Sequence, residues 1–163
     1  NDFSIFESGI LSLVNNQKIL HDFLYKEKYD NTKTYNSERK RRLSFEYYIG
    51  KEKFEYKNLQ IEIDLTLENE GYVTIFECKN TKPNKCFNIY QLYNPFRYYY
   101  NLKEENKLNI KDLTACYIIR WKNKSNSIVR LYNYKFDNPF DITSIKLIKK
   151  KEYHLRKKDF ENE

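Results

Sequence analysis

Two apolar segments joined by a short turn constrain the fold of this sequence most. Segment 58–67 alternates apolar side chains with polar ones, which is the pattern of a strand with one apolar face. The residues Glu-Asn-Glu-Gly that follow are typical of a turn, and segment 72–80 is apolar on both faces, as a central strand would be. We therefore predict an antiparallel hairpin whose second strand lies in the middle of a sheet.

The remaining elements are predicted from apolar spacing and from turn residues. Apolar positions recur at three- and four-residue spacing near the start of the chain, which indicates an amphipathic helix. A second helix, which Pro95 is expected to kink or divide, follows the central hairpin. The expected segments are a helix over 3–29, a polar connection over 30–42, paired strands over 43–50 and 51–56, a helix over 86–107, strands over 113–121 and 127–136, and a stretch over 140–158 that fits either a strand pair or a helix.

This order of elements favours an α/β (α+β) fold with a central mixed β-sheet flanked by helices. The chain has 163 residues, of which 40% are hydrophobic and 17% aromatic, so we expect one folded domain over residues 1–163. Because the sequence begins with Asn and not with Met, this domain could also be the C-terminal catalytic part of a longer chain.

Charge and cysteine content narrow the possible functions. The chain carries 30 Lys and Arg against 23 Asp and Glu, a formal charge of +7, which favours a polyanionic partner such as nucleic acid. No run of about 18 apolar residues could span a membrane, and the N-terminal residues lack the pattern of a secretion signal. The three cysteines form no CxxC pair, which disfavours a zinc site or a disulfide scaffold. We expect a cytoplasmic protein without a membrane partner.

The predicted hairpin brings charged side chains together. A turn centred between Glu70 and Gly71 pairs residues whose numbers sum to 141, so Asp64 lies opposite Glu77 and the Glu62 position opposite Lys79. Alternation places all four side chains on one face of the hairpin. Directly opposed carboxylates repel each other, whereas a bound divalent cation turns that repulsion into attraction. The pairing therefore predicts a metal site at Asp64 and Glu77.

The carboxylate ligands indicate which metal would bind and which reaction it would support. Carboxylate oxygens prefer hard cations, and Mg²⁺ is the natural candidate. A carboxylate-bound Mg²⁺ can acidify water and neutralise charge on a phosphate, and Lys79 could hold the attacking water or stabilise the developing charge. We therefore expect phosphodiester hydrolysis.

The segment from Ile61 to Tyr100 resembles the PD-(D/E)XK nuclease superfamily, which includes many type II restriction endonucleases. The resemblance rests on Asp64, twelve intervening residues, and Glu77-Cys78-Lys79 on an apolar strand. It implies a restriction-endonuclease-like core in which Asp64 and Glu77 bind Mg²⁺, with Mn²⁺ as a substitute, and Lys79 assists the water. Glu-x-Lys also occurs at Glu38, Glu55 and Glu105, but only Glu77 interrupts an apolar run and has an Asp at hairpin distance.

The resemblance also implies a catalytic Gln and a partner. Gln91, on the helix after the motif, matches the glutamine that many members place near the metal acids. The common Gln-x-x-x-Tyr form is interrupted because the fourth residue after Gln91 is Pro95, and Tyr98 is the nearest substitute. Double-stranded DNA is the implied substrate, and a homodimer is expected by analogy with restriction enzymes.

Further residues are candidates for supporting roles. Glu7, at the border of the first helix's apolar stripe, is either an additional metal ligand or a surface residue. Glu62 is either an additional ligand or the ion-pair partner of Lys79. The candidate nucleic-acid-binding residues are Arg39, Lys40, Arg41, Arg42 and Arg97, which could contact phosphates or bases; the alternative is a solvated face for the first four and an aromatic core for the last.

Four functional interpretations stay open at this point, the last of which is a structural or partner-binding domain whose acidic residues are incidental. The first is a Mg²⁺-dependent DNA endonuclease, either a type II restriction enzyme or its catalytic domain. The second is a repair or recombination nuclease of the same fold, and the third is a nucleic-acid-binding module without catalysis. The third leaves the opposition of Asp64 and Glu77 unexplained.

Overall fold

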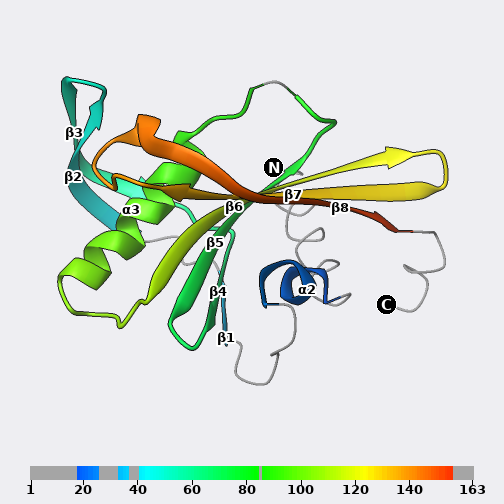
Figure 1. Cartoon of the computed structure of the whole chain (residues 1–163). Helices are drawn as coiled ribbons and strands as arrows, with labels where there is room; N and C mark the ends of the chain where they lie inside the picture. The colour runs from blue at the N-terminus through cyan, green and yellow to red at the C-terminus, as the bar shows by residue number, and fades with distance from the viewer. Residues whose placement is uncertain (1–17, 26–32, 37–40, 85, 156–163) are drawn as a thin grey trace.

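The structure is a computed structural model that describes residues 18–25, 33–36, 41–84 and 86–155. Within these residues the chain forms two helices, a short 3₁₀ helix and eight strands (Figure 1). In chain order they are α2 (Ile19–Tyr25), β1 (Lys33–Asn36), β2 (Arg41–Ile49), β3 (Glu52–Ile61), β4 (Leu65–Asn69), β5 (Tyr72–Asn80), α3 (Tyr90–Glu104), β6 (Asp112–Asn123), β7 (Asn126–Phe136), η1 (Ile142–Ser144) and β8 (Ile145–Leu155).

Six strands form one mixed sheet in the order β1-β4-β5-β6-β7-β8, and β2 pairs with β3 in a separate hairpin. Only β5 and β6 are parallel, and α3 connects them, because a parallel pair requires a crossover between its strands. The other neighbours in the main sheet are antiparallel. The fold is therefore α+β with a central mixed sheet, as the sequence predicts.

The two faces of the sheet have different cores. On one face, α2 covers apolar residues of β4 to β8, and on the other, α3 and the β2–β3 hairpin cover residues nearer the start of β5 and β6 (Figure 1). Alternation along β5 separates the two sets: Phe76 and Cys78 belong to the α2 core, whereas Val73 and Ile75 belong to the α3 core. Glu77 and Lys79 therefore lie on the α3 face.

The turn between β4 and β5 fixes the register of the central hairpin. Glu70 and Gly71 both have positive φ angles, 51° and 89°, as a type I′ turn requires. This two-residue loop pairs Leu65 with Phe76, and the predicted sum of 141 is confirmed.

Four expectations on the elements were incomplete or wrong. The polar connection predicted over 30–42 contains the strand β1, which pairs with β4 in the main sheet. Segment 58–67 is not one strand, because the chain leaves β3 after Ile61 and joins the main sheet at Leu65. Pro95 does not divide the second helix and is buried within α3. The ambiguous C-terminal stretch forms η1 and the single strand β8.

Two further observations concern helices. Of the first predicted helix, the structure describes residues 18–25, and Ile19–Tyr25 are helical there. No helix among the described residues is long and apolar enough to cross a membrane.

Candidate active site

Asp64 and Glu77 meet where β4 begins to pair with β5. Asp64 directly precedes β4, one step beyond the Leu65–Phe76 pair, so it faces Glu77 as the register predicts. The two carboxyl groups lie within hydrogen-bonding reach of each other. The break in segment 58–67 thus places an acidic residue at the point where the chain enters the sheet.

Lys79 completes a cluster of three charged groups. Its Nζ lies 3.2 Å from Oε1 of Glu77, and the two residues share a face of β5. The Glu77 side chain is 10% exposed and that of Lys79 is 30% exposed, so the carboxylate is buried and the ammonium reaches solvent. A substrate approaching from solvent would meet Lys79 first.

Burial raises the pKa of Asp64 because the ionised form loses hydration. The backbone N–H of Cys78, which donates to Oδ2 of Asp64 over 3.1 Å, lowers this pKa, as do Glu77 and Lys79. Burial outweighs these contacts, and the net shift is upward. The site therefore holds a carboxyl group that ionises less readily than one in water.

The donor set fits a hard divalent cation. Asp64 and Glu77 supply carboxylate oxygens, and Mg²⁺ is usually held by one or two carboxylates while water and substrate phosphate fill its other positions. Among the described residues, no three His, Cys, Asp or Glu side chains gather as a complete metal site. Two carboxylates alone leave the other positions of such a cation to water and substrate.

Glu62 and Gln91 are not joined to this cluster by a direct contact. Glu62 is exposed in the connection before β4, and Lys79 pairs with Glu77, so the predicted Glu62–Lys79 ion pair is absent from the described contacts. The nearby Glu62 charge does raise the pKa of Asp64. Gln91 lies half-buried in the first turn of α3 and makes no described hydrogen bond to Asp64, Glu77 or Lys79.

The predicted basic cluster is only partly described. Glu7, Arg39 and Lys40 lie outside the described residues. The Arg41 guanidinium lies over the rings of Tyr98 and Tyr99, at 5.2 and 5.7 Å from their centroids. Arg42 is exposed and donates to the carbonyl oxygen of Asn58 over 3.1 Å. Arg42 is thus open to solvent, whereas Arg41 packs on α3.

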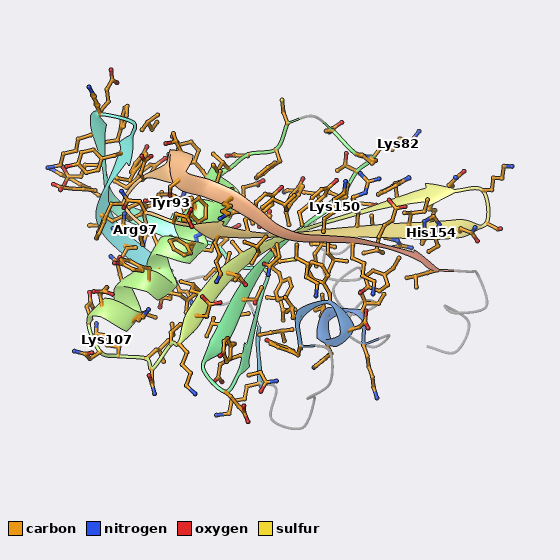
Figure 2. All side chains as sticks on the ribbon, viewed as in Figure 1. Lys82, Tyr93, Arg97, Lys107, Lys150 and His154 are labelled. Carbon is orange, nitrogen blue, oxygen red and sulfur yellow. The ribbon has the colours of Figure 1, made fainter. Side chains whose placement is uncertain are left out.

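The prediction that Arg97 contacts nucleic acid is wrong, because this side chain is 3% exposed. It lies between α3 and the β2–β3 hairpin (Figure 2), where it donates to the Glu46 carbonyl oxygen over 2.7 Å and to the Tyr93 hydroxyl over 3.1 Å. Its guanidinium also lies 4.9 Å from the centre of the Phe45 ring. Arg97 therefore holds the hairpin against the helix.

Two tyrosines beside the cluster were missed by the sequence analysis. Tyr117 pairs with Glu77 across β5 and β6, and Tyr132 pairs with Tyr117 across β6 and β7. The three side chains form one row on the α3 face. Period-two alternation in segments 113–121 and 127–136 could have placed both tyrosines on one face, but the parallel register that aligns them with Glu77 has no short turn to reveal it.

The comparisons with known proteins give one match. Residues 3–154 match the family model described as Domain of unknown function (DUF6997). No curated protein and no solved structure matches the chain.

Proposed function

We propose that this chain, which belongs to the DUF6997 family, is a Mg²⁺-dependent deoxyribonuclease that hydrolyses phosphodiester bonds. The observation that carries the proposal is the meeting of the Asp64 and Glu77 carboxyl groups on a sheet face, with Lys79 3.2 Å from Glu77. The resemblance of Asp64 and Glu77-Cys78-Lys79 to the PD-(D/E)XK pattern supports the same reaction. The net charge of +7 supports a polyanionic substrate.

The chain's own groups have distinct roles in this proposal. Asp64 and Glu77 would hold the cation, which would supply positive charge beside the scissile phosphate and would acidify water. Lys79 donates hydrogen bonds to the phosphate oxygens on which negative charge grows as water attacks phosphorus. The attacking water releases one proton to solvent, the bond from phosphorus to the leaving sugar oxygen breaks, and that oxygen takes a proton from solvent. The products are a phosphomonoester and a free hydroxyl group.

The burial of Asp64 gives this reaction a pH dependence. A protonated Asp64 cannot bind the cation, and burial raises the pKa of this carboxyl group. Cleavage at limiting Mg²⁺ should therefore fall as the pH decreases toward that raised pKa, and added Mg²⁺ should restore it by competing with the proton.

Isosteric substitutions test the proposal with little change in packing. Cleavage of supercoiled plasmid and of labelled oligonucleotides is measured in Mg²⁺, in Mn²⁺ and in EDTA. Asp64→Asn and Glu77→Gln should each abolish metal-dependent cleavage. Glu55→Gln is a matched control, because Glu55 also begins a Glu-x-Lys sequence but is exposed on β3. Glu55→Gln should cleave like the wild type.

The products separate the kinds of nuclease. Discrete fragments would support a restriction enzyme, and end trimming or cutting at junctions would support a repair nuclease. DNA binding without cleavage in any metal, or equal cleavage by Asp64→Asn and the wild type, would refute the proposed active site.

A further inference from the structure

A hollow of about 140 Å³ lies one strand away from Glu77, because its lining residue Tyr117 is the β6 partner of Glu77. One wall comes from the connection between β5 and α3, and the floor comes from β6 and β7. Its lining residues are Thr81, Asn84, Cys86 and Phe87 on the wall, and Tyr117, Ile119, Tyr132 and Tyr134 on the floor. The hollow is therefore lined largely by aromatic rings.

The register of the sheet gives the separation between the hollow and the acidic pair. Glu77, Tyr117 and Tyr132 are paired in turn on β5, β6 and β7. Neighbouring strands lie about 4.8 Å apart, so Tyr117 and Tyr132 begin about 5 and 10 Å from Glu77. This span suits a single nucleotide whose phosphate lies at the acids and whose base lies over the tyrosines.

The rings in the hollow present flat surfaces. Phe87 stacks on Tyr117 with 5.1 Å between centroids and 23° between planes. Tyr132 and Tyr134 are also stacked, at 6.4 Å and 17°. All four rings are half-buried, and the part of an aromatic face that reaches solvent can bind a nucleobase by stacking, with little dependence on the base.

Positive charge surrounds the hollow. Arg130 and Lys150 lie over the Tyr132 ring at 6.0 and 5.4 Å, and Lys79 lies on the acidic side. Arg130 is paired with Glu152, whereas Lys150 has no acidic partner in the described part of the chain. Figure 2 shows Lys150 and Lys82 on the side of the sheet opposite α2. These cations complement the phosphates that flank a bound base.

We propose that this hollow binds an unpaired nucleobase next to the phosphodiester bond that the protein cleaves. The inference rests on the proposed function and specifies its substrate. Inside a duplex, neighbouring base pairs cover both faces of each base, so a tyrosine on a sheet can stack only on a base that has left the helix. The substrate at the cut is therefore a single strand, a single-stranded overhang or a flipped nucleotide.

Cys86 provides a direct test, because it lines the hollow and is exposed, while Cys78 and Cys116 are buried. The rate at which Ellman's reagent modifies the native protein should follow Cys86. In EDTA, a short oligo(dT) should slow this modification several-fold at saturation. The same strand annealed as a blunt duplex should give little protection at equal concentration.

Substitutions at Tyr132 identify the contact. Affinity for oligo(dT) can be followed by the fluorescence of Trp121, the single tryptophan, which lies under Arg130 at 5.2 Å. Tyr132→Ala should weaken binding about 5- to 150-fold, the range expected for one lost base–aromatic stack. Tyr132→Phe should bind within a few-fold of the wild type because the ring remains. Tyr72→Ala, which removes an exposed tyrosine at the start of β5, is the matched control.

These measurements test whether the hollow binds DNA, independently of whether the protein cleaves it. Alkylation of Cys86 with a bulky maleimide should block oligo(dT) binding, a result that needs no substitution in the sheet. Equal protection by duplex and single strand would overturn the requirement for an unpaired base, and no protection by either would overturn the site itself. Because these measurements exclude metal, a failure to cleave DNA would refute the nuclease and leave the hollow supported by its own result.

Discussion

Replacing Asp64 with Asn should change the stability of the protein in opposite directions with and without metal. In EDTA, the wild type keeps two acidic side chains opposed at the start of β4, and burial disfavours the ionised form of Asp64. Asn has the same shape, and its carbonyl oxygen can still accept from the N–H of Cys78. The variant therefore removes the charge and keeps the contact.

The expected magnitudes follow from the geometry of the pair. Burial of the ionised Asp64 outweighs its contacts to Cys78, Glu77 and Lys79, so Asp64→Asn should raise the melting temperature in EDTA, by about 2–4 °C for each 1 kcal/mol of burial cost that the neutral amide avoids. Mg²⁺ at a hundred times its dissociation constant stabilises a bound protein by about 2.7 kcal/mol. The wild type should then melt about 5–11 °C higher than in EDTA, while Asp64→Asn should respond little.

The pH dependence of folding stability provides a second test of the same prediction. Because the pKa of Asp64 is raised in the folded protein, the folded state holds this proton more tightly than the unfolded chain does. In EDTA, the wild type should therefore lose stability as the pH rises from about 4, the unfolded value, through the raised folded pKa. The advantage of Asp64→Asn should be largest at neutral pH and should vanish below about pH 4.

Differential scanning calorimetry of the two proteins across pH and Mg²⁺ concentration measures both effects. A wild-type melting temperature that does not respond to Mg²⁺, Mn²⁺ or Ca²⁺ would refute the cation site. An Asp64→Asn variant that is less stable than the wild type in EDTA at neutral pH would show that the charged contact to Lys79 outweighs burial, and the expected gain in stability would be refuted.

Four other substitutions have outcomes that the structure specifies. Lys79→Ala should slow single-turnover cleavage about 10²–10³-fold and change DNA affinity only slightly, because charge on the phosphate oxygens grows in the transition state; cleavage within a few-fold of wild type would exclude this role. Arg97→Met should lower the free energy of unfolding in urea by about 3 kcal/mol, since it leaves the Glu46 carbonyl oxygen without its charged donor, and a loss below about 1 kcal/mol would contradict a structural role. Gly71→Ala should cost about 1–2 kcal/mol, because its φ is 89° and a Cβ there would lie 2.9 Å from Cγ of Lys111. Gly50→Ala, where a Cβ meets nothing within 4 Å, should cost less, and equal costs would remove the steric part of that explanation.

The central hairpin could be predicted from the sequence because local residues determine it. A two-residue loop ending in Gly71 fixes the register, and simple counting then places Asp64 opposite Glu77. The break before Leu65 could not be predicted in the same way. Alternation of apolar and polar residues continues through Glu62, and such a pattern shows which side chains are apolar but not which sheet a strand joins.

The burial of Arg97 could not be predicted from the sequence for a related reason. A cation among tyrosines has the same sequence signature in a stacking surface and in a core. Its burial depends on the β2–β3 hairpin, whose residue Glu46 lies 51 positions earlier and supplies the carbonyl oxygen that the guanidinium needs. The row of Tyr117 and Tyr132 beside Glu77 likewise depends on a crossover through α3, which no local pattern encodes.

The lysine run near the C-terminus has a consequence that follows from its place in the sheet. Among the described strands, β8 has a neighbour on one side only, and an open strand edge is a template on which other chains can pair and aggregate. Four of the 11 residues of β8 are lysines: Lys146, Lys149, Lys150 and Lys151. Their charges repel a second copy of the same edge, so part of the positive charge that suggests a polyanionic ligand also keeps the protein from polymerising through its sheet.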